Sequence, residues 1–303
     1  MRAFTMKKSC YPESPLSDSQ LDSFHEDGFL VIRDFYDKKN DIEPIQRAIY
    51  NLVQLVIHQN SLNISQPPFT PSSFDYGYNA LIELDRSLGG VVYDAIKQIP
   101  AFMRLVSHEK NERIMQQLRC TSSVAIGAGS FGIRIDNPGE SQHLTLWHQE
   151  YPTHLGSLDG VIFWSPLLSI RQDMGPVKIV AGSHKDGVRK LVVQNSELKS
   201  VGNNYQELAK NLIIDDLEQL LTDNTIVDPL TNAGDLLIMD YRTVHSSSEN
   251  LSNRSRWTMQ MRYFNFEEKT GMSNNWIGGI AQGNSIFDVN PDLLIEQGEN
   301  NAM

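Results

Sequence analysis

Two histidines and a glutamate in this chain have the residue types and the spacing of a metal site. The segment Trp147-His-Gln-Glu150 places an imidazole at residue 148 and a carboxylate at residue 150, and side chains two residues apart on a strand leave the same face. A third candidate, His245, follows a second strand-like run much later in the chain. Two imidazoles and one carboxylate on one face of an octahedral ion leave three positions open, which is the arrangement that non-haem Fe(II) oxygenases use for a cosubstrate and oxygen.

A strongly alternating segment begins at Arg256, shortly after His245. From residue 256 to residue 263 polar and apolar side chains alternate, so one face is expected to pack in a core and the other to line a polar space. Arg256 and Arg262 lie on the polar face, and a buried guanidinium requires an anionic partner. A carboxylate bound through both of its oxygens would meet that requirement. The alternative is an ordinary strand whose polar face meets solvent.

The elements that must position these residues begin with a mainly helical part. Residues 1–16 are polar and contain proline, which favours a flexible arm. Ser17 or Asp18 can cap a first helix, which Gly28 ends. Periodicity and proline positions then predict a strand at residues 29–33, a helix at 41–60, a loop at 61–73, a helix at 90–99 ended by Pro100, and a helix at about 101–118.

From residue 121 onward, short β-like runs are separated by Gly, Pro and Asn, which predicts an antiparallel sandwich or barrel. An amphipathic or mixed segment at residues 205–222 interrupts the strands. The polar residues 291–303 are expected to form a C-terminal tail, so residues 17–290 are expected to form a single domain. The predicted strand runs are residues 124–126, 132–135, 160–164, 177–180, 236–239 and 257–266.

The composition of the chain limits the classes of binding partner and the cellular location that we expect. With 26 Lys and Arg against 37 Asp and Glu, the formal net charge of −11 argues against nucleic acids and anionic membranes as main partners. A hydrophobic fraction of 40% is enough for a sizeable core. Cys10 and Cys120 form neither a CxxC pair nor a Cys/His ligand pattern, so we expect no disulfide framework and no structural zinc site. Since no run approaches about eighteen apolar residues, a soluble, cytoplasmic protein is expected.

Over most of its length the chain resembles the phytanoyl-CoA dioxygenase family of Fe(II)- and 2-oxoglutarate-dependent oxygenases. The resemblance implies a mainly β protein with some α-helix, in which a double-stranded β-helix (a cupin-like jelly roll) is flanked by N-terminal helices. It also implies that Fe(II) is bound by His148, Glu150 and His245, and that 2-oxoglutarate and O2 are cosubstrates. The segments that carry it are residues 25–32, residues 92–97 with Pro100, Trp147-His-Gln-Glu150, Trp164-Ser-Pro-Leu167, Met174-Gly-Pro176, Gly182-Ser-His184, Ala233-Gly-Asp235, His245 and Arg256.

The same resemblance assigns further residues to the site. Arg256 would hold the distal carboxylate of 2-oxoglutarate, and Ser247 and Trp164 match positions that line the cosubstrate pocket. No catalytic group beyond the metal ligands is expected. Candidates for contact with a substrate, chosen for their place beside the motif or their inward direction on a strand, are Arg134, Tyr151, His154 and Arg262.

One position departs from the family pattern, because the second ligand is usually Asp and is here Glu150. The extra methylene lengthens the arm but keeps the charge. Since a carboxylate is present, the site also differs from that of the family's halogenases, which replace it with a small residue. The resemblance therefore implies hydroxylation, or another oxidation by hydrogen abstraction, with CO2 and succinate as co-products. Because no cluster of Lys or Arg in the sequence suggests coenzyme A, and the net charge is −11, a small polar or biosynthetic metabolite is favoured as the substrate.

Two alternatives remain open. A catalytically silent relative of the same fold would bind metal or ligand without turnover, and a broken His/Glu/His triad or the loss of Arg256 would indicate it. Neither change is seen in the sequence. A zinc hydrolase could use the same three ligands, but it would need a base that activates water and would have no use for Arg256. The arginine therefore separates the two classes of enzyme.

Overall fold

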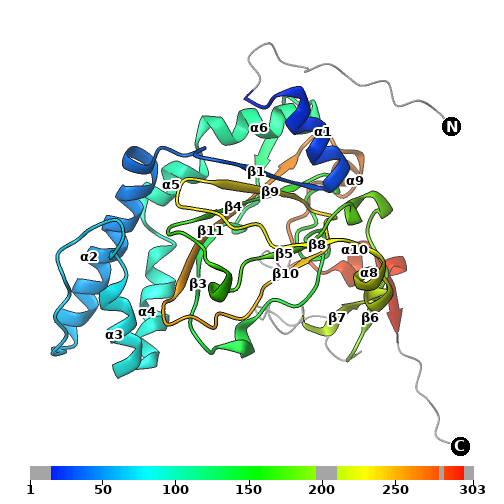
Figure 1. Ribbon diagram of the computed structural model, residues 1–303. Helices are drawn as coiled ribbons and strands as arrows, with labels where there is room; N and C mark the ends of the chain where they lie inside the picture. Colours follow the sequence, from blue (N-terminus) through cyan, green and yellow to red (C-terminus); the bar gives the residue numbers. More distant parts are fainter. Residues whose placement is uncertain (1–14, 196–209, 280–282, 297–303) are drawn as a thin grey trace, which may run out of the picture.

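The computed structural model describes residues 15–195, 210–279 and 283–296. At its centre lies an antiparallel six-stranded sheet with the order β1-β9-β4-β11-β2, in which β3 also pairs with β11 (Figure 1). These strands are β1 (Phe29–Ile32), β2 (Val124–Ile126), β3 (Gly132–Asp136), β4 (Val161–Pro166), β9 (Leu236–Asp240) and β11 (Arg256–Asn265).

Two three-stranded sheets complete the β structure of the described residues. One has the order β10-β5-β8 and the other the order β12-β6-β7. The fold is the predicted jelly roll of antiparallel strands flanked by N-terminal helices, and each predicted strand run coincides with a strand. The strands of the smaller sheets are β5 (Lys178–Val180), β6 (Leu191–Val193), β7 (Leu212–Ile214), β8 (Ile226–Val227), β10 (His245–Ser246) and β12 (Leu294–Glu296).

Strand β11 lies between β4 on one side and β2 and β3 on the other, and its alternation has the predicted consequence. Trp257, Met259 and Met261 are fully buried. The Trp257 ring packs edge-to-face against Phe74 and Tyr78 from the helical part, and such aromatic pairs add to the free energy of apolar burial. This face joins the helices to the sheet, and the opposite face is left for polar residues.

The first helix, α1 (Asp18–Asp27), begins and ends at the predicted residues. Ser17 forms a capping box with Gln20, which satisfies free backbone N–H groups at the helix start. Gly28 ends the helix with a φ of 76°. A Cβ at Gly28 would lie 2.3 Å from His184 Nδ1, so both the backbone angle and the close approach require glycine.

The helices α2 to α5 gather beside the sheet, and α6 lies with α1 at its upper edge in the view of Figure 1. A short π-helical turn (Lys38–Ile42) precedes α2. The region predicted as one helix from about residue 101 to 118 is two helices, because His108 caps a new helix by accepting from the N–H of Lys110. Helix α3 was not predicted. The bounds are α2 (Glu43–Gln59), α3 (Tyr76–Leu84), α4 (Arg86–Ile96), α5 (Pro100–Val106), α6 (Glu109–Arg119), α8 (Leu217–Asp223), α9 (Lys269–Ser273) and α10 (Ile286–Val289).

Both predicted domain boundaries need correction. Leu16 was assigned to the arm, but its backbone N–H and C=O both bond to the side chain of Gln117, at 2.8 and 2.7 Å. Residues 1–14 of that arm lie outside the described residues. Residues 291–296 were assigned to the tail, yet Pro291–Leu293 form a 3-10 turn and β12 pairs in parallel with β6. The domain therefore includes Leu16 and residues 291–296.

Three further features complete the comparison with the sequence. Cys120, which ends α6, is disulfide-bonded, so the expectation that the cysteines form no disulfide is wrong. In the segment predicted at 205–222, residues 205–209 lie outside the described residues, and the remainder contains β7 and α8. Within the described ranges, no helix is both long and apolar enough to cross a membrane.

Candidate metal centre

The structure brings His148 and His245 together through a pair of backbone hydrogen bonds. Each residue donates its N–H to the carbonyl of the other at 3.0 Å, and the two rings lie 4.2 Å apart between centroids. His245 opens β10, which pairs with β5. His148 itself forms only this isolated bridge, so the predicted strand through residues 148–150 is not present.

Glu150 reaches the site by a turn instead of by strand alternation. Its backbone is helical (φ −74°, ψ −36°), and it precedes the 3-10 turn Tyr151–Thr153. The N–H of Glu150 donates to the carbonyl of Tyr241 at 2.8 Å, which fixes the start of that turn beside the segment that leads to His245. The side chain of Gln149 points elsewhere and donates to the carbonyl of Gly187 at 2.8 Å, as expected of a residue outside the site.

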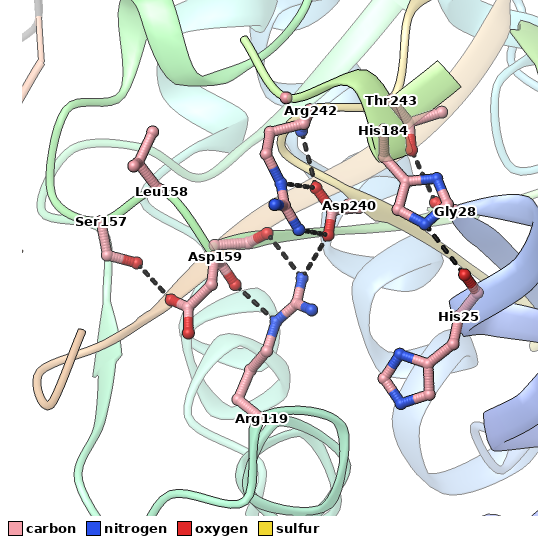
Figure 2. A network of polar contacts seen from close by, with 12 residues as sticks. His25, Gly28, Arg119, Ser157, Leu158, Asp159, His184, Asp240, Arg242 and Thr243 are labelled. Carbon is pink, nitrogen blue, oxygen red and sulfur yellow. Dashed lines mark hydrogen bonds and ion pairs between the residues drawn. The ribbon is translucent and has the colours of Figure 1, made fainter. Parts of the chain in front are cut away.

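The turn that leads into His245 is held by a buried ionic network (Figure 2). Asp240, at the end of β9, accepts from Arg119 of α6 at 2.7 Å and from Arg242 at 2.9 Å. The Thr243 hydroxyl donates to the carbonyl of Gly28 at 2.8 Å. Burial raises the pKa of Asp240, but the two guanidinium groups outweigh it and lower the pKa to about 2. Contacts from α1 and α6 therefore fix the backbone just before the second histidine.

Both imidazoles present the same nitrogen to the centre of the site. Nδ1 of His148 lies 2.8 Å from the carbonyl of Leu146, and Nδ1 of His245 lies 2.9 Å from the carbonyl of Thr243. A carbonyl can only accept, so each Nδ1 carries the proton and each Nε2 offers a lone pair. The Nε2 atoms lie 3.7 and 3.6 Å from Oε2 of Glu150. One donor atom from each of the three residues falls within 4.8 Å of the others.

The two oxygens of Glu150 have different surroundings. Oε1 accepts from Nε of Arg262 at 2.6 Å and lies 2.9 Å from Nδ1 of His154. Oε2 is buried and has no hydrogen-bond partner among the described residues. Burial opposes the ionised form of this carboxyl, but Arg262 and then His154 hold its pKa well below the usual range. Glu150 is therefore an anion with one bonded oxygen and one oxygen facing the imidazoles.

The donor set fits a divalent metal ion. Burial, followed by the neighbouring His148, lowers the pKa of His245 to about 3, so His245 is neutral at physiological pH. Metal ligation requires a neutral imidazole and an ionised carboxylate. Two imidazole nitrogens and one carboxylate oxygen are typical of mononuclear Fe(II) sites and occur at catalytic zinc sites. The unpartnered Oε2 of Glu150 is the kind of buried atom that an ion would satisfy.

The three residues face a cavity of about 510 Å³. Arg256 is buried in its wall and pairs with Asp136 at 2.8 Å, while its Nη1 has no hydrogen-bond partner within the described part of the chain. Arg256 therefore offers a donor to a ligand. The other predicted residues that line this cavity are Trp164, Ser247, Arg134, His154 and Arg262.

Tyr151 is a correction to the predicted site. It is fully buried and is not among the described residues that line the cavity. Its hydroxyl donates to Asn290 at 2.8 Å, and burial raises its pKa to about 12. Tyr151 opens the 3-10 turn that follows Glu150 and lies outside the described lining of the cavity, so we no longer expect it to contact a substrate there.

Sequence reasoning missed the partner of the arginines. Asp136 on β3 lies directly opposite Arg256 on β11 and accepts from it, and it also accepts from Arg134 at 2.7 Å. The signal was present for Arg256, since a buried guanidinium requires a carboxylate, but the register that pairs β11 with β3 was unknown. Lys97 at the end of α4 and Lys210 also line the cavity, and no local pattern marks either of them.

The geometry can now be set beside known proteins. The family model described as phytanoyl-CoA dioxygenase (PhyH) matches residues 24–258. The chain belongs to this family. Membership confirms the resemblance recognised from the sequence and, with it, the expected enzyme class. A relative from Bos taurus, phytanoyl-CoA dioxygenase domain-containing protein 1, is 24% identical over 296 residues, which cover 86% of this chain and 94% of that protein.

Solved structures of this fold include two with ligands. EctD from S. alaskensis, crystallised with 2-oxoglutarate and 5-hydroxyectoine, has a TM-score of 0.52 at 15% identity and covers 84% of this chain and 78% of its own. The epimerase SnoN, crystallised with Fe3+, alpha ketoglutarate and nogalamycin RO, has a TM-score of 0.51 at 13% identity. The match covers 82% of this chain and 83% of the SnoN chain. At these identities the likeness establishes the shared fold.

Proposed function

We propose that this protein is an Fe(II)- and 2-oxoglutarate-dependent dioxygenase that hydroxylates, or otherwise oxidises by hydrogen abstraction, a small polar metabolite, with CO2 and succinate as co-products. The observation that carries the proposal is the His148–Glu150–His245 cluster in the same cavity as Arg256, whose Nη1 is buried without a partner. A zinc hydrolase would leave that cation unexplained. Family membership supports the same class of enzyme.

Each residue of the site has a distinct part in this proposal. Nε2 of His148, Nε2 of His245 and Oε2 of Glu150 would hold Fe(II). Nη1 of Arg256 would donate to the distal carboxylate of 2-oxoglutarate, with Ser247 and Trp164 beside it. When bound, the iron and 2-oxoglutarate together supply the oxidising power that breaks a substrate C–H bond. The residues of the protein bind the iron and 2-oxoglutarate, orient the substrate and exclude water from the site.

The relatives support a small molecule as the substrate. EctD was crystallised with 5-hydroxyectoine and SnoN with nogalamycin RO, and both are small molecules. A cavity of about 510 Å³ lies within the range of pockets that bind ligands of this size. Arg134 donates to Thr145 and to the carbonyl of His143, at 2.6 and 2.9 Å, so it is held firmly in the wall where such a molecule would lie.

Charge favours a substrate that is itself an acid. Among the described residues that line the cavity, Glu150 supplies the negative charge. From outside the cavity, Asp136 compensates two of the arginines and Asp94 pairs with Lys97 at 3.2 Å. Because the charges of Fe(II) and the 2-oxoglutarate dianion cancel, a surplus of positive charge remains for the substrate. The cationic residues that line the cavity are Lys97, Arg134, Lys210, Arg256 and Arg262.

The proposal is tested by adding Fe(II) and 2-oxoglutarate to the protein without oxygen and recording the visible charge-transfer absorption of the complex. We expect the band in the wild type, its loss in Glu150→Ala, and a higher 2-oxoglutarate concentration at half-saturation in Arg256→Ala. A wild type that binds metal but gives no band would contradict the proposal and favour the silent relative or the zinc enzyme. Retention of the full band in Glu150→Ala would contradict the assignment of that ligand.

A further inference from the structure

We propose that Arg262 is a positioning residue of the metal site, which holds the Glu150 carboxylate so that Oε2 faces the two imidazoles. This inference rests on the metal site of the proposed function. It concerns a residue beyond the family match, which ends at residue 258. The sequence suggested Arg262 as a substrate contact, but the structure directs its Nε to a metal-ligand candidate instead.

The contact is short, charge-assisted and buried. Nε of Arg262 donates to Oε1 of Glu150 at 2.6 Å, and the Glu150 side chain is 1% exposed. Nδ1 of His154 lies 2.9 Å from the same oxygen. Both contacts therefore go to Oε1, and none of the described residues bonds to Oε2. Two partners on one oxygen fix the plane of the carboxylate and leave the other oxygen for the ion.

The guanidinium is itself held in place. Nη1 lies 3.3 Å from the carbonyl of Ser130, and Nη2 lies 3.2 Å from Oε1 of Gln260. The backbone of Arg262 belongs to the central strand β11, where it lies opposite Ile162 of β4. All three nitrogens thus have contacts, and the side chain is anchored in the middle of the sheet. A group so constrained is suited to orienting a neighbour.

This arrangement gives a reason for the unusual ligand. Glu150 leaves the chain from a helical turn, and its side chain must reach both Arg262 and the space between the histidines. An aspartate at the same backbone position would be one methylene shorter. It could approach Arg262 or the imidazoles, but the geometry that serves both would be lost. The common family residue is therefore expected to impair this particular site.

The test is an anaerobic titration of the metal-free protein with Co(II), followed by the visible absorption that reports the ligand set. We expect Arg262→Met to raise the Co(II) dissociation constant about 10- to 100-fold, as for other residues that orient metal ligands. Arg262→Lys keeps the positive charge but has fewer hydrogen-bond donors, so its Co(II) dissociation constant should lie between those of the wild type and Arg262→Met. Arg254→Met removes a comparable partner of the buried Asp75, outside the cavity, and should leave the dissociation constant unchanged.

Glu150→Asp completes a double-mutant cycle. We expect it to weaken Co(II) binding at least tenfold in the wild-type background. When Arg262 is already Met, the same substitution should weaken Co(II) binding by a clearly smaller factor, because the two residues act as a unit. Folding of every variant is checked by circular dichroism, and Arg262→Lys and Glu150→Asp carry the test if Arg262→Met does not fold. Unchanged affinity in a folded Arg262→Met, or additive effects in the cycle, would overturn the inference. A wild type that binds no metal would instead overturn the proposed function.

Discussion

At the scale of single residues, the site is organised by which atom of each side chain is already bonded. His148 and His245 donate from Nδ1 to backbone carbonyls, which leaves Nε2 facing inward. Glu150 accepts hydrogen bonds at Oε1, which leaves Oε2 for a metal ion. Arg256 pairs with Asp136, which leaves Nη1 for a ligand. The protein fixes one end of each functional group and presents the other, so the cavity is preorganised before any ligand binds.

Asp136 is the residue on which two arginines depend. Burial raises its pKa, but the guanidinium groups of Arg256 and Arg134 outweigh burial and lower it, so the group is ionised at neutral pH. Asp136→Asn would leave both arginines without a carboxylate. We expect the free energy of unfolding to fall by about 3 kcal/mol, as when one partner of a buried pair is removed. We also expect weaker 2-oxoglutarate binding, because Arg256 loses the group that orients it.

These two effects are measured by urea unfolding at pH 7 and by titration of the anaerobic iron complex with 2-oxoglutarate. Asp173→Asn is the control, since Asp173 pairs with Arg171 at an exposed position, and it should change the unfolding free energy by less than about 1 kcal/mol. If Asp136→Asn bound 2-oxoglutarate as tightly as the wild type, Asp136 would have no part in positioning Arg256.

At the scale of elements, sequence periodicity predicted which faces of the strands are buried, but it did not predict the turn that holds Glu150. The alternation after Arg256 predicted both faces of β11, because a buried strand must separate apolar from polar side chains. Glu150 was expected on a strand, but it lies in a turn fixed by a hydrogen bond to Tyr241, a contact between distant segments. For the same reason Tyr151 was wrongly assigned to the cavity. Long-range contacts of this kind leave no local pattern in a sequence.

The junction of β9, α6 and the turn before His245 depends on the charge of Asp240. Its folded-state pKa of about 2 lies below the ordinary value of 3.8, so the ionised form stabilises the fold above pH 3.8, and this contribution is lost as the pH falls through 2. The difference corresponds to about 2 kcal/mol. We expect Asp240→Asn to lower the unfolding free energy at pH 7 by at least this amount.

The measurement is a series of urea unfolding experiments from pH 7 to pH 2. The stabilities of wild type and Asp240→Asn should converge as the pH approaches 2, because Asp240 is then increasingly protonated in the wild type as well. Glu83→Gln, at an exposed position on α3, serves as the control and should change the stability little at any pH. A constant difference between the two proteins over the whole range would show that the charge of Asp240 does not stabilise the junction.

At the scale of the whole molecule, the net charge and the charge around the cavity have opposite signs. The chain carries a formal charge of −11, yet cationic side chains outnumber carboxylates around the cavity. Composition argued against nucleic acids as main partners but could not predict the electrostatic field in the pocket, because that field depends on which residues the fold brings together. An acidic protein with a basic cavity repels anions at long range and attracts them at the entrance.

The cavity field predicts selectivity between compounds that differ only in charge. Candidate substrates are supplied in pairs, as the carboxylic acid and as its primary amide, and substrate-dependent succinate formation is followed. We expect the acids to be the substrates, and Lys97→Gln or Lys210→Gln to raise the KM for an acid several-fold while the anaerobic 2-oxoglutarate band is retained. Lys39→Gln, at an exposed position on the π-helical turn, should leave KM unchanged.

Ionic strength provides a second arm of the same experiment. Since the Debye length is about 8 Å at physiological salt and shorter above it, attraction between an acid and the lysines is screened as salt is added. The KM for an acid should rise with salt in the wild type and rise less in Lys97→Gln, because part of the attraction is already gone. Amides used as readily as their acids, with a KM insensitive to both lysines, would mean that the cationic residues serve only 2-oxoglutarate and the fold.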